Sequence, residues 1–260
     1  MSDPVLILTM KWGTLYGAGD VNRLYRQVRR HLARPFRFIC FTEDGRGIDP
    51  GVEVLPLPEL GLPKGNTDTR WRKLALFQPD LGGFAGMTAL FLDLDLVVVD
   101  DMSPFFDLPG EFLIIRDDDL FRPKPLRRIN AQRDAFLHSV GNSSVFRYTV
   151  GAHADVLAGY LADSAAAARD YEHEQQYLSA VLLAQGRLSY WPRGLCVSFK
   201  NDCVPRNLRS YLRDPSLPPG ARIVLFAGNP KMADVFSGKG NRWYRRIGNI
   251  NWLRQAWTAQ

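Results

Sequence analysis

Hydrophobic and polar positions along the chain form an alternation of short apolar runs and helical stripes. Apolar residues dominate 5–10 and 36–42, and between them the segment 20–33 carries apolar residues at helical spacing behind Asp20. Apolar runs of this length are typical of buried strands, and the stripe is typical of an amphipathic helix with Asp20 as its N-cap. A strand, a helix and a second strand in this order predict a parallel pair of strands.

Similar patterns continue along the rest of the chain. Further strands are predicted at 52–57, 89–99, 111–117, 143–150 and 222–228, and helices at 70–77, 153–170 and 171–186. The proline- and glycine-rich stretch 58–69 and the basic stretch 120–134 are predicted to be loops. Strands that alternate with helices favour an α/β domain with a Rossmann-like, mostly parallel sheet flanked by helices. We expect this single domain to span 1–240 and a basic aromatic tail to occupy 241–260.

Two aspartates interrupt the strand predicted at 89–99. Asp93 and Asp95 stand between ALFL and LVVV, and residues two apart in a strand face the same side. Burial of an unpaired carboxylate costs several kcal/mol, so a cation or a strand end must relieve them. At the carboxyl end of a parallel strand, two carboxylates suit Mg²⁺ or Mn²⁺ bridging to a phosphate. The alternative is that both aspartates cap helices or pair with arginines.

Composition sets the class of protein but not its partners. The hydrophobic share of 46% over 260 residues is enough for a core without disulfides. Cys40, Cys196 and Cys203 are scattered without zinc-ligand spacing, which predicts idle thiols in a reducing compartment. The first apolar run is too short for a signal peptide, so we expect a cytoplasmic protein.

Basic residues are spread along the chain. The net charge of +6 is distributed over 23–37, 122–133 and 242–254 and suits phosphorylated substrates, an anionic membrane or nucleic acid equally well. The tail 241–260 interleaves arginines with aromatic residues, so it could rest on the inner face of the membrane as a peripheral contact. Docking on the domain is the favoured alternative, and nucleic acid is the least favoured partner because no RNA-binding module is present.

One local motif is similar to that of a hydrolase family. FLDLDLVVVDD resembles the first motif of haloacid-dehalogenase-type phosphatases, which implies Asp93 as a nucleophile. That family usually has a small or hydroxyl residue soon after the second aspartate, whereas Leu96, Val97 and Val98 follow here. Its motif also tends to lie on the first strand, whereas here two or three predicted strands precede it. The resemblance covers one strand only.

Four ordered blocks carry a wider resemblance. They are the predicted strand–helix–strand opening that ends in FICFTED; WRKLALFQPDL leading into ALFLDLDLVVVDDM; GNSSVFRY with HEQQYLSAVL behind it; and IVLFAGNPKM. Together they resemble nucleotide-diphosphosugar glycosyltransferases of the GT-A fold, especially the family-eight group that includes glycogenin and bacterial lipopolysaccharide galactosyltransferases. The resemblance implies a GT-A fold and a hexosyltransferase that uses a nucleoside-diphosphate sugar, UDP-linked, as its donor.

The resemblance also implies roles for individual residues. Asp93 and Asp95 would bind Mn²⁺ or Mg²⁺ with the donor diphosphate, and Glu174 and Gln175 would lie in the active centre, with Glu174 in place of the family's aspartate. The residues implied to contact the nucleoside, the diphosphate or the donor sugar are Thr9, Lys11, Tyr16, Lys73, Asn142, Ser143 and Lys231. Taken alone, Lys73 suits a solvated lysine equally well, a polar turn is favoured for Asn142 and Ser143, and a surface position is usual for a glutamate such as Glu174.

One feature of the family pattern is missing. The family usually has a histidine just before the last glycine block as a third metal ligand, but Leu225, Phe226 and Ala227 occupy that stretch and the nearest histidine is His173. The alternatives are a weaker metal site, a third ligand from elsewhere or a loss of activity.

The implied reaction is metal-assisted departure of a nucleoside diphosphate while a hydroxyl of a glycan, lipid-linked or protein acceptor attacks, with retention of configuration. A leaving phosphate that takes the acceptor's proton would make a dedicated base unnecessary. Two further hypotheses remain, a phosphatase and a non-catalytic nucleotide-sugar-binding protein.

Overall fold

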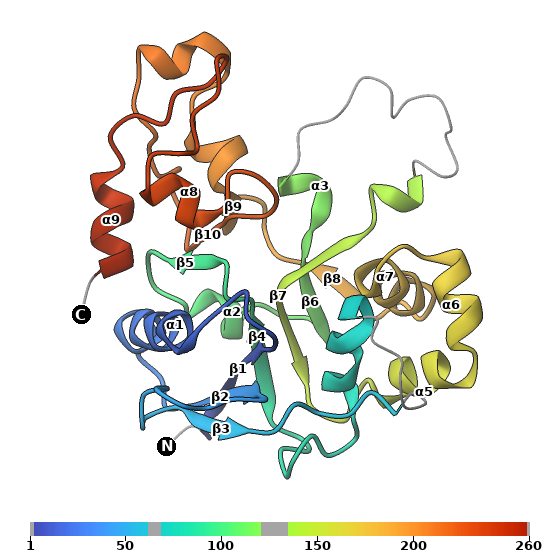
Figure 1. Ribbon diagram of the computed structural model, residues 1–260. Coiled ribbons are helices and arrows are strands. Elements are labelled where there is room, and N and C mark those ends of the chain that lie inside the picture. Colours follow the sequence, from blue (N-terminus) through green and yellow to red (C-terminus); the bar gives the residue numbers. More distant parts are fainter. Residues whose placement is uncertain (1–2, 62–68, 121–134, 259–260) are drawn as a thin grey trace.

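The computed structural model describes residues 3–61, 69–120 and 135–258. Most of the loop predicted at 58–69 and nearly all of the loop predicted at 120–134 fall outside these residues. The described strands form two sheets. The larger has seven strands in the order β3-β2-β1-β4-β7-β6-β8 (Figure 1). Its strands are β1 Val5–Lys11, β2 Phe36–Thr42, β3 Glu53–Leu55, β4 Thr88–Leu92, β6 Phe112–Arg116, β7 Gly141–Thr149 and β8 Leu188–Tyr190.

Most pairings in the larger sheet are parallel. β1 pairs in parallel with both β2 and β4, with Thr9 opposite Cys40 and Leu8 opposite Phe91. The exception is β7, which is antiparallel to β4 on one side and to β6 on the other. The structure thus confirms the predicted α/β class with a mostly parallel sheet.

The prediction of one continuous strand at 89–99 is wrong, because this segment forms two strands. β4 ends at Leu92, and the chain enters a second sheet through β5 Leu96–Val98, which pairs antiparallel with β10 Ile223–Leu225. The third strand of this small sheet is β9 Cys196–Ser198. Asp93 and Asp95 therefore lie in the connection between two sheets rather than inside a strand.

Helices cover both faces of the larger sheet. The helices of the described residues are α1 Ala18–His31, η1 Thr69–Phe77, α2 Pro104–Asp107, α3 Asp117–Leu120, α5 Ala154–Ala162, α6 Ser164–Asp170, α7 Glu174–Ala184, η3 Phe199–Cys203, η4 Asn207–Tyr211, α8 Met232–Phe236 and α9 Asn251–Thr258. Figure 1 shows α1 and α2 on one side, and η1, α5, α6 and α7 on the other. Within the part of the chain that is described, no helix has the length and apolar character needed to cross a membrane.

Two predictions about helix boundaries need correction. α1 begins one turn earlier than predicted, and Asp20 is not its N-cap but accepts a hydrogen bond from the backbone N–H of Gly17 at 2.8 Å. The single helix predicted at 153–170 is two helices. Asp163 separates them because its carboxylate accepts from the backbone N–H of Ala166 and so caps a new helix start.

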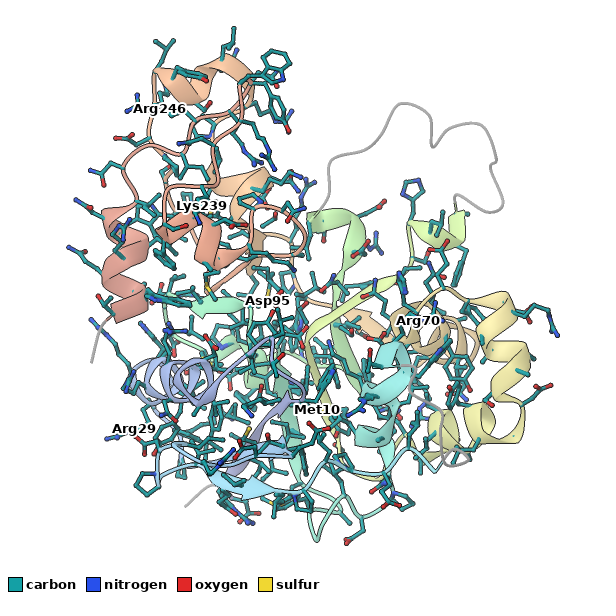
Figure 2. All side chains as sticks on the ribbon, viewed as in Figure 1. Met10, Arg29, Arg70, Asp95, Lys239 and Arg246 are labelled. Atoms are coloured by element: carbon teal, nitrogen blue, oxygen red, sulfur yellow. The ribbon has the colours of Figure 1, made fainter. Side chains whose placement is uncertain are left out.

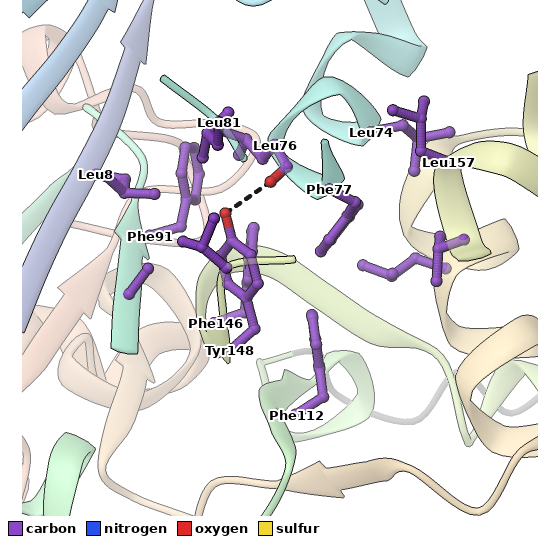
Figure 3. Packing of buried hydrophobic residues seen from close by; sticks show 14 of the residues in the cluster. Leu8, Leu74, Leu76, Phe77, Leu81, Phe91, Phe112, Phe146, Tyr148 and Leu157 are labelled. Atoms are coloured by element: carbon purple, nitrogen blue, oxygen red, sulfur yellow. Dashed lines mark hydrogen bonds between the residues drawn. The ribbon is translucent and has the colours of Figure 1, made fainter. Parts of the chain in front are cut away.

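An aromatic cluster forms the core on the η1 side of the sheet. The ring of Phe77 lies 6.0 Å from those of Phe112 and Phe146 and 5.3 Å from that of Tyr148 (Figure 3). The Tyr148 hydroxyl donates to the Leu76 carbonyl oxygen at 2.8 Å. Both bonding groups belong to buried residues, and the bond fixes η1 against β7.

The predicted tail is partly docked on the domain. In α9, Leu253 is fully buried, and the Arg23 guanidinium of α1 lies 3.6 Å from the centre of the Trp257 ring. The Gln27 side chain donates to the Ala256 carbonyl oxygen. The helix α9 of the tail is therefore docked on the domain, which was the favoured alternative.

Candidate active site at the edge of the larger sheet

Four strands contribute residues to one edge of the larger sheet. β1, β4 and β6 run in the same direction and end there, whereas β7 runs in the opposite direction and begins there. The edge therefore collects Lys11, Asp93, Asp117 and Asn142. Ligands of open α/β sheets bind outside the carboxyl ends of parallel strands. Figure 2 shows Asp95 where this edge meets the C-terminal part of the molecule.

The connection that carries the two aspartates is held by both sheets. The backbone N–H of Asp93 donates to the Ser144 carbonyl oxygen of β7 at 2.9 Å. The carbonyl oxygen of Asp95 accepts from the backbone N–H of Phe226, just after β10, at 3.0 Å. Because both ends are fixed, the two carboxylates are kept close together although their peptide is not part of a strand.

Lys73 supplies a partly buried positive charge next to the aspartates. Its ammonium group donates to Asp93 Oδ2 at 2.8 Å and to the carbonyl oxygen and Oγ of Ser143 at 3.1 and 3.3 Å. Burial lowers the pKa of Lys73, but the carboxylates of Asp93 and Glu174 outweigh burial and leave the pKa raised. The lysine is therefore charged, and each of its three protons has an acceptor.

The helix η1 keeps Lys73 in place. Trp71, which is 1% exposed, stacks on Tyr160 with ring centres 4.9 Å apart. In a 3₁₀-helix residues three apart share a face, so Arg70 and Lys73 both border the same hollow.

The start of α7 completes the polar network. Ser143 Oγ donates to Glu174 Oε1 at 2.6 Å, and the backbone N–H of Ser143 donates to Gln175 Oε1 at 3.4 Å. Ser143 thus joins Lys73 to Glu174, and the predicted residues Asp93, Lys73, Ser143 and Glu174 form one connected group.

Negative charge is in excess at this site. Burial, and then repulsion by Asp93, raises the pKa of Asp95 to about 6, although Lys73 and Lys231 act in the opposite direction. Burial and the same two aspartates also raise the pKa of the Tyr16 hydroxyl. Such a site has a deficit of positive charge that a bound cation would relieve.

The carboxylates fit Mg²⁺ or Mn²⁺ only together with a phosphate ligand. Among the described side chains, no group of three or more His, Cys, Asp or Glu is placed to hold a metal ion. Where the resembling family has its histidine, Leu225 and Phe226 are buried core residues. Mg²⁺ commonly binds through one or two carboxylates, substrate phosphates and water. Asp93 and Asp95 match that donor set.

A hollow of about 290 Å³ opens beside the acidic pair. Its lining includes the aromatic residues Trp12 and Tyr16 and the charged residues Lys73, Asp95 and Glu174. The arrangement offers aromatic surface for a planar ring and charged groups for a diphosphate. A second and larger hollow of about 970 Å³ is bordered by Arg70 and Gln175, so it adjoins the first.

Several residues implied by the resemblance lie outside this group. Thr9 is completely buried, and the Lys11 ammonium donates to Thr42 Oγ1 at 3.3 Å and to the Asp44 carbonyl oxygen at 3.1 Å. The Asn142 side chain donates to Asp117 Oδ1 at 3.0 Å and accepts from the backbone N–H of Ser144. Lys231 is exposed at the start of α8.

Sequence reasoning missed three residues of the site. Trp12 and Arg70 border the hollow, and Asp117 is bonded to Asn142. Arg70 has a signal in the sequence, since it stands three residues before Lys73 in a predicted helix. Asp117 also has one, because it is the last residue of the strand predicted at 111–117 in the same sheet as Asp93.

The chain has the fold of GT-A glycosyltransferases, as its similarity to several solved structures shows. The galactosyltransferase LgtC, in complex with donor and acceptor sugar analogues, matches with a TM-score of 0.63 and 14% identity over 97% of this chain and 95% of LgtC. The bifunctional glycosyltransferase WbbM matches with a TM-score of 0.58 and 14% identity over 89% of this chain and 47% of WbbM.

The glycosyltransferase GlyE of Streptococcus pneumoniae matches with a TM-score of 0.56 and 14% identity over 98% of this chain and 61% of GlyE. No family model and no curated protein matches the sequence. At this level of identity, what the protein shares with these glycosyltransferases is the fold.

Proposed function

We propose that the protein is a hexosyltransferase that moves a sugar from a nucleoside-diphosphate sugar, UDP-linked, to an acceptor hydroxyl. The observation that carries this proposal is the acidic pair Asp93 and Asp95, which borders a hollow with aromatic residues in its wall and a charged lysine beside it. A nucleotide sugar has the matching parts, namely a planar base, a diphosphate that binds divalent cations, and a sugar.

The aromatic and the charged residues of the hollow orient the donor. The base packs against Trp12 and Tyr16, which places the diphosphate at Asp93 and Asp95. A Mn²⁺ or Mg²⁺ ion held there would neutralise the diphosphate as a leaving group. Lys231 is exposed and close enough to affect the pKa of Asp95, so its ammonium can approach the β-phosphate as negative charge develops there.

The remaining residues position the reacting sugar. Lys73 and Ser143 hold Glu174 in the wall of the donor hollow, next to Gln175 in the sequence. The acceptor enters through the larger hollow bordered by Arg70 and Gln175. A hydroxyl that attacks from the side of the departing phosphate gives its proton to that phosphate, which retains the configuration and requires no separate base.

The test combines binding with turnover. Titration calorimetry with UDP, with and without Mn²⁺, should show binding that depends on the metal and is lost in Asp95→Ala. Asp100→Ala is the matched control, because Asp100 lies on the same segment but pairs with Arg222 outside the hollow. Nucleotide sugars supplied with Mn²⁺ and a pool of saccharide acceptors should then release nucleoside diphosphate.

Other outcomes would contradict the proposal in distinct ways. Phosphate release from an aryl phosphate that disappears in Asp93→Asn would identify a phosphatase. Binding of nucleotide sugars without turnover under any divalent cation would identify a binding protein. Failure of every nucleotide to bind would rule out both the transferase and the binding protein.

A further inference from the structure

Exposed apolar side chains gather at one end of the molecule. Among the described residues, eight large apolar or aromatic side chains are exposed, and five of these lie in the segments 206–213 and 242–246, which we call the tip. The five are Leu208, Tyr211, Leu212, Trp243 and Tyr244. Leu212 is 85% exposed and Trp243 is 83% exposed. Single exposed apolar residues are ordinary, but a cluster marks an interaction surface.

The tip is a built structure in which two distant segments are bonded together. The backbones of Arg242 and Arg245 exchange hydrogen bonds of 2.7 and 2.9 Å, which places Trp243 and Tyr244 at the end of a tight turn. The Tyr211 hydroxyl donates to the Trp243 carbonyl oxygen at 3.0 Å. The aromatic side chains therefore project from a fixed backbone. In Figure 1 the tip stands away from the larger sheet, beyond β9 and β10.

The charge of the tip has one sign. The segments contain six arginines and no acidic residue; the arginines are Arg206, Arg209, Arg213, Arg242, Arg245 and Arg246. All but Arg245 are exposed, and Figure 2 shows Arg246 at the outer end. Trp and Tyr favour the level of lipid headgroups, and arginines are attracted to anionic lipids.

We propose that the tip docks on the surface of an anionic lipid bilayer and holds the protein there peripherally. Trp243, Tyr244, Leu208 and Leu212 enter the headgroup layer, and the arginines around them contact lipid phosphates. The sequence had suggested the tail as a whole for this role. In the structure the tail has two parts with different surroundings. Leu253 in α9 is buried in the domain, whereas Trp243 in the tip is exposed.

A nucleic acid is a poorer match for the same surface. A hollow of about 550 Å³ is lined by Arg206, Arg209 and Arg213 of the tip, but Asp119, Asp202 and Asp214 also line it. A polyanion that entered the hollow would meet these carboxylates, whereas the five exposed apolar side chains of the tip do not line the hollow and suit the headgroup layer of a bilayer. The charge pattern therefore favours a membrane over RNA.

Co-sedimentation of the full chain with lipid vesicles tests the proposal. Vesicles of phosphatidylcholine alone are compared with vesicles in which part of that lipid is replaced by phosphatidylglycerol, each at low and high salt. We expect binding to the anionic vesicles only, weakened by salt. The tryptophan emission should shift to shorter wavelength on binding, and this shift should shrink in Trp243→Phe.

Two pairs of variants separate the apolar and the ionic contribution. Trp243→Ala with Tyr244→Ala should weaken the partition coefficient at least about tenfold, and Leu161→Ala on α5 is the exposed apolar control. Arg209→Glu with Arg213→Glu should weaken it at least about 25-fold, since each arginine near an anionic surface contributes about fivefold. Arg26→Glu with Arg30→Glu on α1 is the control of equal charge.

Melting temperatures of all variants establish that they are folded. The proposal is overturned if the unaltered chain ignores anionic vesicles, or if folded tip variants bind them as well as the controls do. It is also overturned if a single-stranded RNA oligonucleotide binds and the vesicles do not. The donor hollow is untouched by these variants, so this result is independent of the proposed reaction.

Discussion

At the scale of one residue, Asp95 shows that a side chain placed to bind a cation can destabilise the folded protein without its ligand. It is held beside Asp93 in a largely buried position, and its pKa is raised to about 6. In neutral solution the folded protein therefore carries a carboxylate that would be better solvated in the unfolded chain. Residues with this property are common where a ligand later supplies the missing charge.

Replacement of this residue should therefore stabilise the protein without ligand. In the absence of divalent cations, Asp95→Asn is expected to raise the free energy of unfolding by about 1–3 kcal/mol, because the amide carries no charge to bury or to repel Asp93. Urea unfolding with a chelator present measures this. Asp100→Asn, which is exposed, should change stability little. A loss of stability in Asp95→Asn would contradict the interpretation.

His153 gives a second prediction at the residue scale, this time on pH. It is 1% exposed and lies edge-on to Phe112, and burial, followed by the charge of Arg187, lowers its pKa from 6.5. The folded state thus favours the neutral ring, and its contribution to stability is complete above pH 6.5 and is lost as the pH falls below that value.

The measurement is the free energy of unfolding across mildly acidic pH. We expect His153→Gln to be less stable than the unaltered protein near neutral pH but to lose less stability on acidification. One proton can contribute a slope of up to about 1.4 kcal/mol per pH unit. The exposed His173→Gln serves as control. Parallel profiles for the His153 variant and the unaltered chain would refute the prediction.

At the scale of elements, the success of sequence reasoning depended on the length of each apolar run. β1 and β2 were predicted almost to the residue because β1 is buried along all seven residues and β2 along its last five. The break after Leu92 was missed, since leucines that alternate with aspartates imitate a half-buried strand. β8 and β9, of three residues each, were missed because a serine interrupts the apolar run that contains each, whereas β10, also of three residues, lies within the longer apolar run IVLFA.

Gly151 allows a prediction about how two elements are joined. It connects β7 to α5 with φ at +85°, and a Cβ there would lie 2.5 Å from the Pro79 carbonyl oxygen. Gly83 has a similar φ of +91° but open space around it. Gly83→Ala should lower the free energy of unfolding by about 1–2 kcal/mol, because alanine is strained in the left-handed backbone conformation. Gly151→Ala should lower it by about 1–3 kcal/mol more, because its Cβ also clashes with the Pro79 carbonyl oxygen. Equal losses in thermal unfolding would show that the contact can be relieved.

At the scale of the whole molecule, the site combines parts that are far apart in the sequence. The order of strands could be expected to gather Asp93 and Ser143, because both lie at strand ends. The order of strands does not predict that Lys73 joins Asp93 to Ser143 or that Ser143 bonds to Glu174, because both contacts depend on how η1 and α7 pack on the sheet. The tip was also out of reach of sequence patterns, since exposure of Trp243 and burial of Leu253 follow from tertiary packing.

The Asp93–Asp95 connection has a consequence for finding ligands. Since the amide of Phe226 is bonded to the Asp95 carbonyl oxygen, a ligand that steadies this turn should slow deuterium exchange at an amide of the other sheet. UDP with Mn²⁺ should protect Phe226 in exchange measured by NMR and leave Val5, at the opposite edge, as before. Unchanged exchange at Phe226 with bound nucleotide would contradict this link. The amide is thus a built-in reporter of occupancy, which can rank donors before any acceptor has been found.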